Sequence, residues 1–132
     1  MRHRKGYRKL NKATDQRMAM LRNMVKSLFV YERIETTVTR AKEARRLAER
    51  LVTVAKTNDV HSRRLVARIL GTERKLTPVE RKKGIEKTDP LRKLFEEIGP
   101  SMAQREGGYT RITRTGPRRG DGVEMAVLEL VA

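Results

Sequence analysis

The stretch YTRITRTGPRRGDGVEMAVLELV, residues 109–131, decides the fold of this 132-residue chain. Tyr109–Thr115 alternates along its length and is rich in β-branched residues, as a strand is. The turn-rich segment GPRRGDG follows, and Val123–Val131 then carries apolar side chains on both faces. The stretch therefore predicts a β-hairpin whose second strand lies inside a sheet and is covered on at least one face.

Upstream of the hairpin, the sequence predicts one more strand and several helices. The six residues 34–39 are rich in β-branched side chains and predict a short strand. Pairing residues 34–38 with the hairpin gives three strands, the minimum for an independently stable sheet. Elsewhere apolar side chains recur at helical spacing. This pattern predicts helices from Thr14 to Phe29, from about Thr39 to Ala55, from Asp59 to Leu70 and from Asp89 to Ile98.

Local signals set the expected ends of these helices. Thr14 is the expected N-cap of the first helix, because its hydroxyl can accept from unpaired backbone N–H groups. Gly71 is expected to close the third helix in the left-handed conformation. Gly99 and Pro100 are expected to stop the fourth, and Ser101 to cap one further short turn.

The order of elements predicts the fold class. We expect an α+β fold with helices packed on one face of a small, about three-stranded mixed sheet, and with an extended basic N-terminal arm. Residues 1–13 form the expected RNA-binding arm and residues 14–132 a single domain. A charged insert at about 72–88 interrupts the domain, and within it Thr77–Gly84 predicts a short capped helix.

The charge of the chain indicates its kind of partner. It has 32 Lys and Arg against 16 Asp and Glu, a formal charge of +16 and a pI near 11.1. Such a balance favours a polyanion, above all a nucleic acid. No run reaches the roughly 18 apolar residues of a membrane span, so we expect no membrane partner. A mitochondrial presequence at the Arg-rich start, and with it an organellar location, is a less favoured alternative.

The sequence contains no motif for catalysis or cofactor binding. Cysteine is absent, and His3 and His61 alone cannot build a structural zinc site. Glu96 and Glu97 are adjacent, so on a helix they point about 100° apart and form no carboxylate pair. The serines lie in no nucleophile motif, and the glycine pair at 107–108 leads into a strand rather than a Walker helix. We therefore expect a non-enzymatic protein with no cofactor, no metal and no small-molecule substrate.

Three groups of side chains are the candidate RNA-binding residues. The arm is too poor in apolar residues to fold by itself and is expected to order on a polyanion. On the hairpin, Arg can fork two hydrogen bonds onto phosphate, and Tyr7 and Tyr109 are placed to stack on unpaired bases. The full set is Arg2, His3, Arg4, Lys5, Arg8, Lys9 and Lys12 in the arm, Arg17, Arg22 and Lys26 in the first helix, and Tyr109, Arg111, Arg114, Arg118 and Arg119 in the hairpin.

An alternative partner is chromosomal DNA. A nucleoid-type protein would use the helices around Asn58 as a helix-turn-helix. Its recognition helix would need polar side chains that read base edges. Residues 63–70 are almost only Arg and apolar, which disfavours this alternative.

Several segments in the same order resemble one known family. They are MRHRKG followed by KLN, then LRNMVKSL, ETTVTRAKEARRLAE, LFEEIGP, GGYTRI and GDGVEMAVLELV. Together they closely resemble the bacterial large-subunit ribosomal protein seventeen family over nearly the whole chain. The longer segment at about 72–88 and Tyr7 beside the arm's glycine depart from the family pattern.

The resemblance implies a function. It implies an α+β protein with an extended basic N-terminus that is a structural constituent of the large ribosomal subunit in the cytoplasm, bound to large-subunit rRNA near the peptide exit tunnel. It implies neighbouring large-subunit ribosomal proteins as further partners, and neither catalysis nor a cofactor. The matching arm and strand start carry over RNA contact to Arg2, His3, Arg4, Lys5, Arg8, Tyr109 and Arg111.

Overall fold

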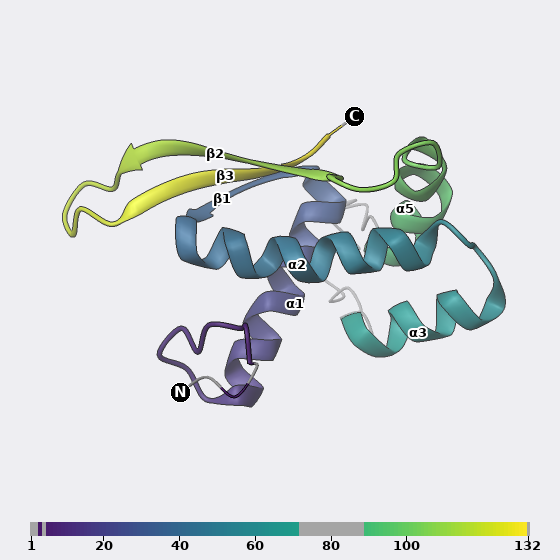
Figure 1. Ribbon diagram of the computed structural model, residues 1–132, viewed down its shortest axis with the longest axis horizontal. Helices are drawn as coiled ribbons and strands as arrows, with labels where there is room; N and C mark the ends of the chain where they lie inside the picture. The colour runs from purple at the N-terminus through teal and green to yellow at the C-terminus, as the bar shows by residue number, and fades with distance from the viewer. Residues whose placement is uncertain (1–2, 4, 72–88, 132) are drawn as a thin grey trace, which may run out of the picture.

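The computed structural model describes residues 3, 5–71 and 89–131 (Figure 1). The helix predicted at Thr77–Gly84 lies outside these residues. In chain order the elements are α1 (Thr14–Tyr31), β1 (Arg33–Thr37), α2 (Val38–Ala55), α3 (Val60–Leu70), α5 (Pro90–Lys93), the π-helical turn η1 (Leu94–Ile98), α6 (Gly99–Ser101), β2 (Thr110–Pro117) and β3 (Glu124–Leu130).

The sheet has three strands in the order β1-β3-β2, so β3 is central as its apolar faces predicted. Both pairings are antiparallel: Ile34 lies opposite Leu128 across one ladder, and Ile112 lies opposite the same Leu128 across the other. The prediction of a mixed sheet is therefore wrong. The strands β1 and β2 run in the same direction, but β3 separates them and no parallel ladder forms.

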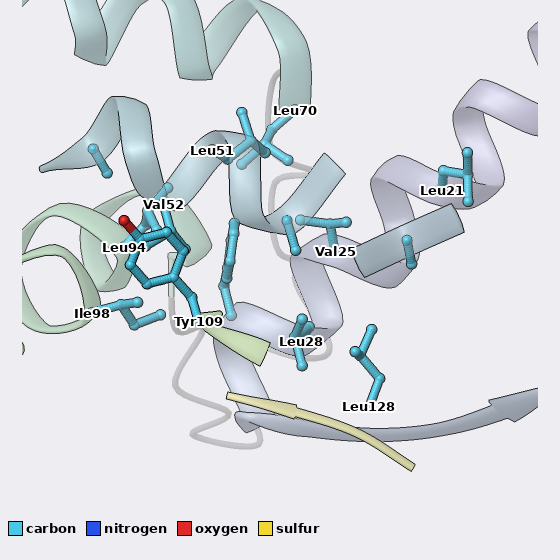
Figure 2. Close-up of a cluster of buried hydrophobic side chains, with 14 of the residues drawn as sticks. Leu21, Val25, Leu28, Leu51, Val52, Leu70, Leu94, Ile98, Tyr109 and Leu128 are labelled. Carbon is cyan, nitrogen blue, oxygen red and sulfur yellow. The ribbon is translucent and has the colours of Figure 1, made fainter. Parts of the chain in front are cut away.

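The helices cover one face and one end of the sheet, which confirms the α+β class (Figure 1). The long helix α2 runs beneath the sheet, and α1 crosses α2. The short helix α5 lies near the C-terminal end of β3. The buried side chains that meet between these layers come mainly from α1, α2, α3, η1 and β3, and the partly buried Ile34 of β1 and Ile112 of β2 pack against them (Figure 2). Fully buried members include Leu28, Leu51, Val66, Leu94 and Leu128.

The helix ends follow their sequence signals in part. Asp59 caps α3 in a reciprocal capping box with Ser62, whose backbone N–H donates to the Asp59 carboxylate at 2.6 Å. Gly71 ends α3 with a positive φ of 80°, but its ψ of 172° is extended and not that of the left-handed conformation predicted there. Thr14 is not the N-cap of α1: Ala13 holds that position, without a side-chain cap, and Thr14 is the first helical residue.

The helical path continues through Gly99 and Pro100, where the sequence predicted a stop. The Gly99 N–H donates to Leu94 O, the wider i to i−5 bond of a π turn. Pro100 then stands in the first turn of α6, where a backbone N–H is not required. A Cβ at Gly99 would lie 3.4 Å from Ala55 O and 3.1 Å from Leu94 O, so glycine permits the close approach of α6 to the end of α2. Ser101 donates to Ile98 O rather than capping a new turn.

Candidate nucleic-acid interface

We call residues 1–13 the N-terminal segment, and its residues 5–13 are folded back onto the helices. The Gly6 carbonyl accepts a hydrogen bond from the Arg46 guanidinium of α2 at 2.8 Å. Arg8 forms an ion pair with Glu43, also of α2, at 3.7 Å. The predicted extended arm is therefore not observed, because α2 supplies a donor and a carboxylate that hold the segment in place.

Two further contacts fix this segment beside α1. The Tyr7 ring lies 4.8 Å from the Arg17 guanidinium, within the range of a cation–π interaction. Leu10, half-buried, packs against the core with a φ of 56°, and Asn11 follows at 51°. These left-handed residues make the turn that leads the chain into α1.

The cationic side chains of the segment point to solvent. Arg2 and Arg4 lie outside the described residues. The side chains at positions 3, 5, 8, 9 and 12 are exposed, and these are His3, Lys5, Arg8, Lys9 and Lys12. The segment is thus anchored by one backbone carbonyl, one ion pair and an aromatic ring, with most of its charge available to a partner.

The predicted residues of α1 do not form one surface. Arg17 is buried, 7% exposed, beneath Tyr7. Arg22 is half-buried, and Lys26 lines a small hollow with Asp89 between α3 and α5. In this arrangement Arg17 is not accessible to RNA.

The turn of the hairpin is a compact cationic loop held by one ion pair. Arg118 donates from its guanidinium to both carboxylate oxygens of Asp121, and its N–H donates to Val123 O. The Arg118 hydrogen bond, helped by the Val123 N–H, lowers the pKa of Asp121 from 3.8 to about 2. A bulge at Thr115, where Gly116 takes a φ of 102°, shifts the register just before the turn.

The four hairpin arginines divide into two pairs. Arg111 lies opposite Glu129 on β3 with an ion-pair distance of 3.6 Å, and Arg118 binds Asp121. Arg114 and Arg119 are exposed and make no ion pair within the part of the chain described. In Figure 1 this hairpin projects beyond the helices, on the side where the N-terminal segment also lies.

The structure corrects the prediction that Tyr109 stacks on unpaired bases. Its side chain is 2% exposed and belongs to the hydrophobic core, with Val52 and Leu94 in the same cluster (Figure 2). Its hydroxyl donates to Arg105 O at 3.1 Å, and the Lys56 ammonium donates to the same carbonyl at 2.7 Å. Tyr109 therefore ties the end of α2 to the start of β2.

Sequence reasoning missed a cationic stripe on α2. Lys42, Arg46 and Arg50 are all exposed and spaced by four residues, which places them on one helix face. Arg46 is also the donor that holds Gly6. The four-residue spacing was visible in the sequence and would have identified the stripe.

The helix α3 contains the residues that would form the recognition helix of the DNA-binding alternative. Arg63 donates twice to the Asn58 side-chain oxygen, at 3.1 and 2.9 Å, and its guanidinium lies 5.3 Å from the Phe95 ring. Arg64 and Arg68 are exposed. The leading arginine of a supposed recognition helix is therefore committed to contacts inside the domain.

The described residues contain neither a candidate metal site nor a candidate membrane span. Residues 3, 5–71 and 89–131 contain no group of three His, Cys, Asp or Glu placed to hold a metal ion. Over the same residues, no helix combines the length and apolarity needed to cross a membrane.

The fold and the distribution of charge define a small, strongly basic α+β protein with exposed cations on the N-terminal segment, along α2, on α3 and in the hairpin. The sequence pattern of the family described as Ribosomal protein L17 matches residues 20–131, from within α1 to the end of β3. The chain belongs to the ribosomal protein L17 family. Membership makes it a ribosomal protein of bacterial type, located in the cytoplasm within the ribosome.

Relatives resemble the chain over almost its full length. A protein of Clostridium acetobutylicum named large ribosomal subunit protein bL17 is 50% identical over 126 residues, 96% of this chain and 97% of its own. The protein of the same name from Clostridium botulinum is 52% identical, covering 96% and 98%. That from Clostridium perfringens is 48% identical, covering 96% and 98%. The resemblance recognised in the sequence is confirmed.

Proposed function

We propose that this protein is a non-enzymatic structural constituent of the large ribosomal subunit that binds and stabilises large-subunit rRNA, near the peptide exit tunnel. The observation that carries the proposal is the gathering of exposed cations on three parts of one small fold of the L17 family. These parts are the N-terminal segment, the α2 stripe and the hairpin. Neighbouring large-subunit proteins are the other proposed partners.

The N-terminal segment is proposed to exchange its contacts within the protein for contacts with RNA. The exposed cation–π contact is worth about 0.5–1 kcal/mol. The ion pair joins the exposed Arg8 to the buried Glu43, so its loss costs more than the about 0–1 kcal/mol of a fully exposed pair. Several phosphate contacts, each releasing condensed counterions, outweigh these terms. A phosphate that competes with Glu43 for Arg8 would release the segment, and lifting Tyr7 would uncover Arg17.

The hairpin is proposed to bind without rearrangement. The backbone ladder between β2 and β3 and the Arg118–Asp121 pair already fix the turn. Arg114 and Arg119 are therefore held at the surface before RNA binds. Double-helical RNA hides its base edges in a deep, narrow major groove. We therefore expect contacts to phosphates, 2′-hydroxyls and irregular RNA shape rather than to sequence.

The test compares the full chain with a variant lacking residues 1–12, in binding to large-subunit rRNA over a salt series. The deletion removes six of the 32 Lys and Arg and no acid, so the formal charge falls from +16 to +10. Each phosphate contact contributes roughly 0.7 to 0.9 to the slope of log affinity against log salt. We expect the slope to fall by up to about 4 to 5 units.

Two outcomes would contradict the proposal. An unchanged salt slope after the deletion would remove the segment from RNA binding. Equal affinity for double-stranded DNA of the same length, together with absence from sedimented large subunits, would favour the nucleoid alternative. Crosslink mapping in intact subunits then tests the position near the exit tunnel.

A further inference from the structure

A hollow of about 210 Å³ opens at the end of the molecule opposite the hairpin turn. It lies where α1 ends and β1 begins, against η1, α6 and the last residues of β3, near the C-terminus in Figure 1. We call it the acidic hollow. Its lining residues are Glu32, Glu97, Ile98, Ser101, Met102 and Leu130.

The floor of the acidic hollow is apolar. Ile98 and Met102 are 5% and 3% exposed, and Leu130 is half-buried beside them. The three side chains come from η1, the residue after α6, and β3, so the floor is part of the packed core rather than a mobile loop. An apolar side chain that enters would gain from contact with all three.

The rim of the hollow is acidic. Glu32 and Glu97 are both exposed, and no Lys or Arg is among the lining residues. Lys93, only 14% exposed, bonds to the Glu32 carboxylate at 2.7 Å and to Val30 O at 2.9 Å. Lys93 thus holds the Glu32 carboxylate at the rim from inside, while Glu97 faces solvent.

This combination of floor and rim selects one kind of partner. In a chain with a formal charge of +16, the lining of this apolar hollow includes no cation that could bind an RNA phosphate. Lys93 offsets the charge of Glu32, so Glu97 supplies most of the repulsion of phosphate there. We propose that the acidic hollow docks a Lys- or Arg-rich protein segment that inserts one apolar side chain, supplied by a neighbouring protein of the large subunit. The proposal rests on the proposed ribosomal function and gives the protein two ends, one for RNA and one for protein.

The test is photo-crosslinking in intact large subunits. The full chain carries p-benzoylphenylalanine in place of Ser101, whose side chain is exposed at the hollow, or in place of Val60, 65% exposed on α3. Subunits that contain the protein are purified and irradiated, and linked peptides are sequenced. We expect the probe at 101, and not that at 60, to join a Lys- or Arg-rich segment of another subunit protein.

A charge reversal makes the test specific. In the chain with the probe at 101, Glu97→Lys should lower the crosslink yield about tenfold, since it replaces an attraction by a repulsion. Glu106→Lys makes the same change at an exposed site that does not line the hollow, and should leave the yield unchanged. Circular dichroism of both variants confirms that each is folded.

The proposal is overturned by a crosslink from 101 to rRNA or to an acidic or neutral peptide, by no protein crosslink in subunits that contain the protein, or by an equal yield with Glu97→Lys. Absence of the protein from purified large subunits is a separate result. It would overturn the proposed function, which the sedimentation step measures before any irradiation.

Discussion

The N-terminal segment and the β2–β3 hairpin both carry clustered cations, but they are held by different means. The segment is attached by side-chain contacts such as Arg46 to Gly6 O and Arg8 to Glu43. The hairpin is held by the backbone ladder of β2 and β3, and its base reaches the core through Leu128. RNA phosphates could therefore compete for the side-chain contacts that hold the N-terminal segment, but not for the backbone hydrogen bonds that hold the hairpin.

In the proposed function, this difference gives the two cationic parts different roles in binding RNA. A segment held by side-chain contacts must give those contacts up to bind RNA, and its net affinity is reduced by that cost. A preformed hairpin presents its charges at no such cost. We expect the hairpin to set the orientation of the protein on RNA and the segment to supply most of the salt-dependent affinity.

The largest effect should come from the core beneath the hairpin. Leu128→Ala removes a fully buried side chain from the central strand and should lower the free energy of unfolding by about 2–5 kcal/mol. Deleting residues 1–12 should cost less, about 1–3 kcal/mol, because it removes mostly exposed contacts. These are the hydrogen bond from Arg46 to Gly6 O, one ion pair, one cation–π contact and the packing of the half-buried Leu10. Urea unfolding followed by circular dichroism measures both, and equal losses would contradict the comparison.

An intermediate effect should separate the hairpin arginines from one another. The double variant Arg114→Gln with Arg119→Gln should reduce the salt slope of rRNA binding by about 1.4 to 1.8 units, the loss of two phosphate contacts. The matched double variant Arg111→Gln with Arg118→Gln should reduce it by less than half as much. Those two guanidiniums already face Glu129 and Asp121, and RNA must break these pairs to use them.

Filter binding over the same salt series measures both double variants. The two carry the same net charge, so a difference between their slopes reports the ion pairs and not the overall field. Identical slopes would show that the ion pairs do not limit access of the arginines to RNA.

The smallest effect should be the pH dependence of the turn. The pKa of Asp121 is lowered from 3.8 to about 2, so the pair with Arg118 stabilises the turn fully above pH 3.8 and loses its effect as the pH falls toward 2. NMR titration of the Asp121 carboxyl carbon should give a midpoint near 2. Arg118→Gln should move the midpoint toward 3.8, and Arg119→Gln should leave it in place; a midpoint near 3.8 in the unaltered chain would rule out the pair.

Local patterns predicted most of the fold, because they are made of neighbouring residues. The alternation in residues 109–115, the turn and the two-faced apolar strand together predicted the hairpin and the central place of β3. The sequence wrongly predicted that the helix stops at Gly99. A π turn lets the helical path continue past Pro100, and apolar periodicity does not reveal such a turn.

The residues of the candidate interface were harder to predict, because whether a side chain is exposed or buried often depends on residues that are distant in the sequence. Tyr109 follows a glycine pair in a basic region, yet Lys56 and the end of α2 enclose it. Arg17 is a different case. We predicted Arg17 to contact RNA, and the structure buries it. It precedes Leu21 and Val25 at four-residue steps, so helical periodicity could have placed it on the buried stripe of α1.

The central position of β3 has a consequence for biosynthesis. Chains emerge from the ribosome N-terminus first, at about 5–20 residues per second. β1 and β2 pair with β3 and not with each other, so neither has a sheet partner while β3 is still untranslated. The helices α1, α2 and α3 can form earlier, but the sheet closes only when its last strand arrives and joins Arg33 to Glu129 across the length of the domain. The sheet of this protein therefore cannot form before β3 is synthesised.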